Sequence, residues 1–193
     1  MSAMPPALIL ASASPRRREL LAGLGLDFEV QPAAIDECPG AGEPAADYVL
    51  RMAREKAQAI AGSAPDRIVL GSDTAVVVDG QPLGKPADFA EARQMLTALS
   101  GREHEVLSAV ALVGPGGEDS VLSRSRVRMR ELTTTEITAY WETGEPADKA
   151  GAYAIQGLGG IFVSHLSGSY SGVMGLPVHE TAELLARAGI RIL

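Results

Sequence analysis

The sequence contains little cysteine and histidine, and each shortage argues against a class of site. Cys38 is the only cysteine among 193 residues, so no disulfide can form within the chain and a reducing compartment is expected. Because Cys38 has no basic neighbour in "IDECPG", we expect an ordinary surface or half-buried thiol rather than a nucleophile. The three histidines, at positions 104, 165 and 179, are scattered and lack the spacing of zinc ligands.

Positive charge and long apolar runs are also in short supply. The chain has 17 Lys and Arg against 24 Asp and Glu, a net charge of −7, which argues against nucleic acid or an anionic membrane surface as a partner. No apolar stretch approaches the ~20 residues that span a bilayer. In "MPPALILASASPRRR" the positive charges follow the apolar residues, the reverse of a secretory signal. We therefore expect a cytoplasmic protein, in which a local cluster of cations would hold any anionic substrate.

The order of apolar and turn-forming residues predicts one α/β domain spanning residues 1–193, with a mixed, twisted sheet and flanking helices. Apolar runs bounded by turn residues predict strands, and the expected strands cover 7–11, 28–30, 67–78, 81–83, 105–113, 121–132 and 161–166. Capping residues and helical periodicity predict helices, and the expected helices cover 15–22, 46–61, the stretch from a cap at 88 to 99, the stretch from a cap at 133 to 143, and 179–188. The glycine-rich segment "GEPADKAGAYAIQGLGG" is expected to be irregular.

Asp73 is the least expected residue of the strand "IVLGSDTAVVV". A continuous apolar run of this length is typical of a strand buried on both faces. An ionised carboxylate removed from water without a partner costs several kcal/mol or more. Positive partners are therefore expected near Asp73.

Two segments could supply those cations and bind an anion. In "SASPRRR" the hydroxyls of Ser12 and Ser14 and the side chains of Arg16, Arg17 and Arg18 lie where a strand turns into a helix. Not all three arginines can point the same way, so we expect at least one of them to be structural. A helix N-terminus attracts anions and guanidinium groups suit phosphate oxygens, although a solvated basic helix start would have the same sequence. Lys56 falls on the apolar stripe of its helix; its ammonium could reach a buried anion or simply extend to the solvent edge.

Three further residues carry weaker signals. Lys85 in "GQPLGKPAD" is held extended by the following proline and could present its charge to a phosphate, or be an ordinary surface lysine; the segment does not match a P-loop. Glu37, beside Asp36 in a loop, could contribute to a Mg²⁺ site or only be solvated. Gln156 could hydrogen-bond a base edge, whereas a plain glycine-rich loop would explain its surroundings equally well.

Taken in order, several motifs resemble those of the Maf family of nucleoside triphosphate pyrophosphatases. The resemblance spans roughly residues 8–185 and rests on "LILASASPRRRELL", "REKA", "VLGSDTAVVVDG", "LGKPAD", "LSGREHEV", "ETGEPADKAGAYAIQGLGG" and "GSYSGVMGLP". It implies a fold related to the inosine triphosphate pyrophosphatases, with two lobes around a cleft. It also implies hydrolysis of a nucleoside triphosphate to the monophosphate and pyrophosphate with a divalent metal, Mg²⁺ or Mn²⁺, and a homodimer.

The resemblance also implies roles for individual residues. The catalytic acidic residue of the family falls on Asp73, its phosphate-handling cations fall on Arg16 or Arg17, on Lys56 and on Lys85, and Glu37 corresponds to a second active-site carboxylate. Asp73 and Glu37 would hold the metal.

Substrate preference follows from three positions of the same motifs. The subgroup that acts on 7-methyl-GTP typically has Trp, Gln and Glu where this chain has Arg16, Thr74 and Gln156, so the chain resembles the dTTP/UTP subgroup. Thr74 and Gln156 would then read the base. Ser72 and Gly172 depart from the commoner pyrimidine pattern and leave the preference among UTP, dTTP and modified pyrimidines open. The alternatives are a 7-methyl-GTP pyrophosphatase, a non-enzymatic nucleotide-binding regulator of cell division or septum formation, and an enzyme acting on a small phosphorylated metabolite.

Overall fold

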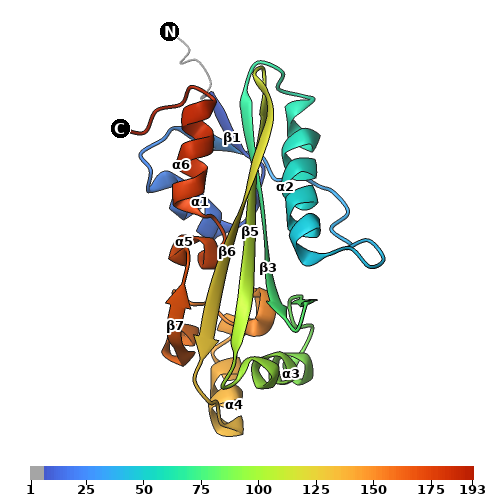
Figure 1. The fold of residues 1–193 in the computed structure, drawn as a ribbon, viewed down its shortest axis with the longest axis vertical. Coiled ribbons are helices and arrows are strands. Elements are labelled where there is room, and N and C mark those ends of the chain that lie inside the picture. The colour runs from blue at the N-terminus through green and yellow to red at the C-terminus, as the bar shows by residue number, and fades with distance from the viewer. Residues whose placement is uncertain (1–6) are drawn as a thin grey trace.

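The computed structural model describes residues 7–193. A seven-stranded sheet runs through the molecule in the order β2-β1-β3-β5-β6-β7, with β4 paired to β3 outside this path. The strands are β1 (Leu8–Leu10), β2 (Phe28–Val30), β3 (Ile68–Val78), β4 (Gln81–Leu83), β5 (Glu103–Gly114), β6 (Gly117–Met129) and β7 (Val163–Ser167). β1 pairs in parallel with both β2 and β3, and all other pairs are antiparallel. The expected α/β architecture is confirmed (Figure 1).

Helices cover both faces of this sheet and one end of it (Figure 1). They are α1 (Pro15–Ala22), α2 (Ala45–Ala61), α3 (Phe89–Leu99), α4 (Thr134–Glu142), α5 (Tyr170–Met174) and α6 (Val178–Arg187). One apolar cluster joins α2 to one face of β3 and β5, and another joins α1 and α6 to the opposite face. A third cluster packs α3 and α4 against the far ends of β3, β5 and β6. The long central strands therefore link two separate groups of helices. None of the helices in residues 7–193 has the length and apolarity needed to cross a membrane.

The helix starts form as their capping residues predict. Ser14 caps α1 by accepting a hydrogen bond from the Arg17 amide at 3.4 Å, and the Asp88 carboxylate caps α3 in the same way at 2.9 Å. Thr133 and Glu136 form the reciprocal capping box at the start of α4. Each cap satisfies backbone N–H groups that have no partner inside the helix.

The long hairpin differs from its prediction at both ends. Gly114 already pairs with Gly117, so β6 begins four residues earlier than expected, and "GPGGED" is mostly strand with a tight turn between. β6 then ends at Met129 instead of residue 132, because the backbone leaves the ladder before the α4 cap. The expected strand at 161–166 lies at 163–167, and helix α5 was not predicted because five residues are too few to show periodicity.

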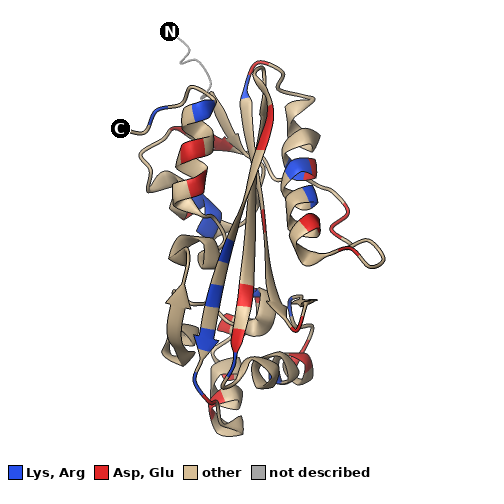
Figure 2. Cartoon of the chain, in the orientation of Figure 1, with Lys and Arg blue, Asp and Glu red and all other residues tan. Residues whose placement is uncertain are grey.

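Exposed charges gather on one face of the far half of the sheet. Arg124, Arg126 and Arg128 alternate with buried Ser125 and Val127 along β6, as expected of a strand with one solvated face. They appear as a blue row on β6 in Figure 2, beside red acidic residues at the start of β5. The net negative charge is thus not spread evenly over the surface.

Candidate active site

The site begins where α2 crosses β3. Gly71 allows the close crossing, because a β-carbon there would overlap the Ala53 carbonyl oxygen and lie 2.8 Å from the Ala57 nitrogen. Side chains alternate along a strand, so Asp73 points to the same side as Gly71, toward the helix. Lys56 follows Ala53 by one turn of α2 and meets it there. The glycine therefore sets the distance between the two charged residues.

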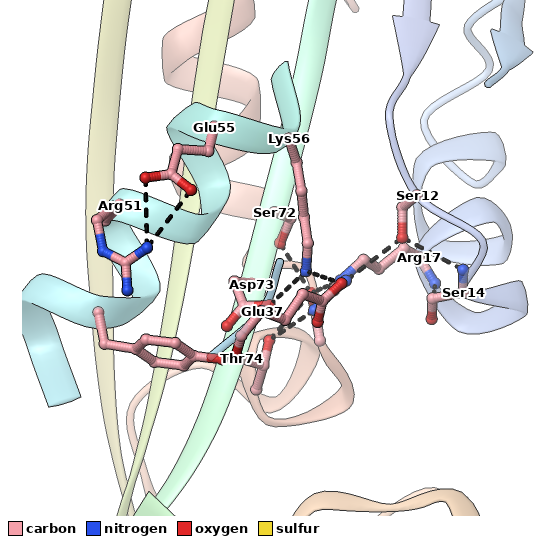
Figure 3. A network of polar contacts seen from close by, with 12 residues as sticks. Ser12, Ser14, Arg17, Glu37, Arg51, Glu55, Lys56, Ser72, Asp73 and Thr74 are labelled. Atoms are coloured by element: carbon pink, nitrogen blue, oxygen red, sulfur yellow. Dashed lines mark hydrogen bonds and ion pairs between the residues drawn. The ribbon is translucent and has the colours of Figure 1, made fainter. Parts of the chain in front are cut away.

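Lys56 and Asp73 form a buried ion pair. The Lys56 ammonium lies 2.7 Å from Asp73 Oδ1 and 3.1 Å from Glu37 Oε1 (Figure 3). Lys56 is 6% exposed and Asp73 is 7% exposed, whereas the Glu37 side chain is 55% exposed at the rim. Of the two alternatives for Lys56, the structure shows the ammonium reaching a buried anion. It also shows what offsets the burial of Asp73.

Arg17 joins the start of α1 to the opposite end of the chain. Its Nε donates to the Gly175 carbonyl at 2.9 Å, and its terminal nitrogens lie 3.3 Å from Ser12 Oγ and from Thr74 Oγ1. Burial lowers the pKa of Arg17 below its ordinary value, while the charges of Asp73 and Glu37 act in the opposite direction. This arginine is held rigidly, with its charge directed toward the two carboxylates.

The other two arginines of the motif differ from Arg17. Arg16 lines the cleft, and in the described part of the chain no acceptor is found for its guanidinium. Arg18 is exposed and does not line the cleft. The expectation that not all three arginines point the same way therefore agrees with the geometry.

The two serines have distinct local roles. Ser14 uses its hydroxyl to cap α1, and buried Ser12 accepts from the Ser14 amide at 3.2 Å as well as from Arg17. Both serines line the cleft. Together they fix the turn that presents the free N–H groups of the helix start, an arrangement that favours anions.

Thr74 is more engaged with protein atoms than the sequence suggests. Its hydroxyl lies 2.9 Å from Ser108 Oγ and 3.3 Å from Arg17. Ser108 in turn donates to the Gly172 carbonyl at 2.6 Å. These contacts place Thr74 beneath Arg17, and its role in reading a base stays a prediction.

All ten expected site residues line one cleft of about 720 Å³. Lys85 is exposed just after the β3–β4 hairpin, and Gln156 is exposed on the irregular segment. The hairpin forms the expected tight turn, with Asp79 and Gly80 both at positive φ. The expected residues are Ser12, Ser14, Arg16, Arg17, Glu37, Lys56, Asp73, Thr74, Lys85 and Gln156.

The cleft also contains residues that the sequence did not single out. Tyr48 donates its hydroxyl to the Glu37 carbonyl at 2.8 Å and so fixes the acidic loop; burial, followed by the charges of Asp73 and Glu37, raises its pKa to about 12. Asp148 and Lys149 form an ion pair on the cleft wall. Tyr48 has the helical spacing of a core residue, and an Asp-Lys pair in a loop is usually solvated. The sequence therefore marks neither Tyr48 nor the Asp148–Lys149 pair as part of a site.

The carboxylates offer a donor set for a hard divalent cation. Lys56 contacts Asp73 Oδ1 and Glu37 Oε1; among residues 7–193 no donor is found for Asp73 Oδ2 or Glu37 Oε2. Residues 7–193 contain no group of three or more Asp, Glu, His or Cys placed to hold a metal. Two carboxylates suit Mg²⁺ or Mn²⁺, which commonly completes its coordination with water and substrate phosphate.

Comparison with known proteins agrees with the motifs. The family model described as "Maf-like protein" matches residues 7–188. A "dTTP/UTP pyrophosphatase" of Hahella chejuensis is 55% identical over 96% of this chain and 94% of its own length. A protein of the same name from Methylococcus capsulatus is 58% identical over 95% of this chain and 91% of its own.

A third relative and one solved structure are also similar to this chain. The "dTTP/UTP pyrophosphatase" of Bordetella parapertussis is 55% identical over all of this chain and 97% of its own. The Staphylococcus aureus Ham1 protein superposes with a TM-score of 0.48 and 14% identity, covering 63% of this chain and 71% of that one.

Proposed function

The chain belongs to the Maf family, and from this premise we propose that it is a nucleoside triphosphate pyrophosphatase acting on dTTP and UTP. The observation that supports this most directly is the buried Lys56–Asp73 pair at the base of a cleft lined by further cations. The same pyrimidine substrates are named for relatives that are 55% and 58% identical to it.

In the proposed reaction, water attacks the α-phosphorus. A new P–O bond forms, the bridging bond between the α- and β-phosphates breaks, and pyrophosphate leaves. Asp73 accepts the proton of the attacking water, and Lys56 holds the carboxylate in place. Arg16, Arg17 and Lys85 neutralise charge on the triphosphate and the leaving group.

A divalent ion completes the proposal. Asp73 and Glu37 would hold it through the oxygens that Lys56 does not contact. When bound, it supplies positive charge to the phosphates and lowers the pKa of a bound water. Comparing turnover with Mg²⁺ and with Mn²⁺ identifies the ion that supports the reaction.

Gln156 provides the proposed base contact. Its amide offers both a donor and an acceptor, as the edge of uracil or thymine requires. It lines the same cleft as Lys85 and Lys149, and the proposal assigns the base to the part of the cleft near Gln156 (the base half) and the phosphates to the part near the cations (the phosphate half).

A panel assay tests the proposed function. Purified protein is incubated with UTP, dTTP, GTP, 7-methyl-GTP and UMP, with Mg²⁺ or Mn²⁺, and pyrophosphate, phosphate and the nucleotide products are quantified. We expect pyrophosphate and the monophosphate from UTP and dTTP. Binding without pyrophosphate release would favour a regulator, preference for 7-methyl-GTP would favour the other subgroup, and turnover of UMP alone would favour a phosphorylated-metabolite enzyme.

Asp73→Asn tests the assignment of the base. Removing a general base costs typically 10²–10⁴-fold in rate, so we expect turnover to fall by about that factor. The affinity for the α,β-methylene analogue of UTP, which cannot be cleaved at that position, should change little. Asp66→Asn, an exposed aspartate outside the cleft, is the matched control. Near-full activity of Asp73→Asn would refute the base assignment.

A further inference from the structure

Gln156 lies on a tight turn whose ends are held from outside the cleft. The Gly157 amide donates to the Ala154 carbonyl at 3.2 Å, which leaves Ile155 and Gln156 at the centre of the turn. A turn of this kind, followed by Gly157 and exposed at Gln156, has few contacts of its own to keep its central side chains in place. Its anchors therefore decide where Gln156 lies.

Tyr140 of α4 anchors the start of the turn. Its hydroxyl accepts a hydrogen bond from the Ala154 amide at 3.1 Å and donates to Glu145 Oε1 at 2.6 Å. The tyrosine is 4% exposed, and its ring packs edge-on against Phe162 with centroids 5.1 Å apart. Because the ring is fixed by packing, the hydroxyl is a rigid acceptor.

Glu145 anchors the end of the same turn. Its carboxylate accepts from the Gly159 amide on Oε1 and from the Leu158 amide on Oε2, both at 3.0 Å. These amides open the short 3₁₀-helix Leu158–Phe162, which has no cap from its own preceding residue. Burial alone would raise the pKa of Glu145. The hydrogen bonds from Tyr140, Gly159 and Leu158 together outweigh this effect, so its pKa lies below the ordinary value and the group is ionised at neutral pH.

One hydrogen-bonded pair thus holds both ends of the turn, and neither member lines the cleft. We propose that Tyr140 and Glu145 are positioning residues that set the affinity and selectivity of the cleft for a pyrimidine base by fixing Gln156. The inference rests on the proposed function, in which Gln156 contacts the base. It assigns the pair no role toward the phosphates.

Two variants loosen this pair by different routes. Tyr140→Phe keeps the packed ring and removes the hydroxyl that joins Ala154 to Glu145. Gly157→Ala keeps both anchoring side chains but adds a β-carbon that would overlap the Glu145 carboxylate, so the carboxylate must move. Tyr170→Phe, at a tyrosine that is 48% exposed and outside the cleft, is the matched control. Thermal unfolding establishes which variants are folded.

The readouts separate the base half of the cleft from the phosphate half. For each folded variant we measure kcat and KM for UTP, kcat/KM for GTP, and inhibition by inorganic pyrophosphate. We expect KM for UTP to rise about tenfold, which corresponds to about 1.4 kcal/mol, with kcat little changed. The preference for UTP over GTP should fall by a similar factor. Inhibition by pyrophosphate should be unchanged, and Tyr170→Phe should behave like the unmodified protein.

Two results would overturn the inference. In either folded variant, an unchanged KM for UTP and an unchanged preference over GTP would mean that the pair does not control base recognition. Equal weakening of UTP and pyrophosphate would mean that it supports the whole cleft. If the unmodified protein binds UTP but releases no pyrophosphate, the proposed reaction fails instead, and UTP affinity in the same variants decides the positioning role.

Discussion

The buried ion pair between Lys56 and Asp73 predicts that two single substitutions differ in their cost to stability. Lys56→Met removes the ammonium and leaves Asp73 buried without its ion-pair partner, beside a second carboxylate, that of Glu37. Asp73→Asn keeps an oxygen that can still accept from Lys56, and Glu37 remains 3.1 Å from the ammonium. Lys56→Met should therefore be the more damaging change.

The distances set the size of this difference. At 2.7 Å and an effective dielectric constant of about 20, the attraction between two unit charges is roughly 6 kcal/mol, and desolvation of both groups offsets part of it. Breaking such a pair from one side typically costs about 3–5 kcal/mol. We expect that loss for Lys56→Met, and about 1–2 kcal/mol for Asp73→Asn, which is typical of a weakened hydrogen bond.

Urea unfolding at neutral pH with EDTA measures these free energies without a bound divalent ion. Arg54→Met is the matched control, because Arg54 lies on the same helix but its side chain is 47% exposed and pairs with Glu118 at the surface; such pairs contribute about 0–1 kcal/mol. The double variant Lys56→Met/Asp73→Asn should lose less than the sum of the single losses, since it leaves no unpaired charge buried at this position. If Lys56→Met costs no more than Arg54→Met, the pair does not stabilise the fold as argued.

Three further predictions follow from other contacts. Gly71→Ala should destabilise the fold by about 1–3 kcal/mol and reduce turnover, because α2 and Lys56 must move away from β3, whereas Gly62→Ala, with nothing within 4 Å of the added carbon, should have little effect in either assay. Burial lowers the pKa of His104 to about 4; the unfolded chain therefore binds more protons between pH 6.5 and 4, and unfolding free energy should fall by about 3 kcal/mol as the pH drops through that range. In urea titrations across that range, this fall in unfolding free energy should be absent in His104→Gln. It should remain in His165→Gln, because that histidine is exposed. Gln156→Glu removes a donor and adds negative charge, so it should raise KM for UTP and dTTP; unchanged rates would contradict the proposed base contact.

Most of the fold could be predicted because local signals agree with tertiary demands. Ser14, Asp88 and Thr133 cap the helices that they precede, and the apolar run around Asp73 forms the long central strand β3. The boundaries of β6 were less predictable, because cross-strand pairing with β5 recruits Glu118 and Asp119 into a ladder despite their low strand propensity. The fold thus overrides local preference where pairing continues from a neighbouring strand.

The site was predictable where a residue contradicts its surroundings. Asp73 in an apolar strand predicted a positive partner. Lys56 on an apolar helix face left two alternatives open, and the structure pairs it with Asp73. Tyr140 and Glu145 contradict nothing locally, since a tyrosine on a helix and a glutamate after a glycine are ordinary. Their importance arises only from hydrogen bonds between residues 13 or 14 positions apart, which no periodic pattern encodes.

The hydrogen bond from Arg17 to the Gly175 carbonyl links positions 158 residues apart. During synthesis the first turn of α1 is made long before Gly175, so Arg17 cannot form this contact until residue 175 has been added and has folded back. A chain truncated before Gly175 is therefore expected to leave Arg17 less firmly placed even if its central strands have already paired. This side of the cleft would then form only after the segment that carries Gly175 has joined the fold.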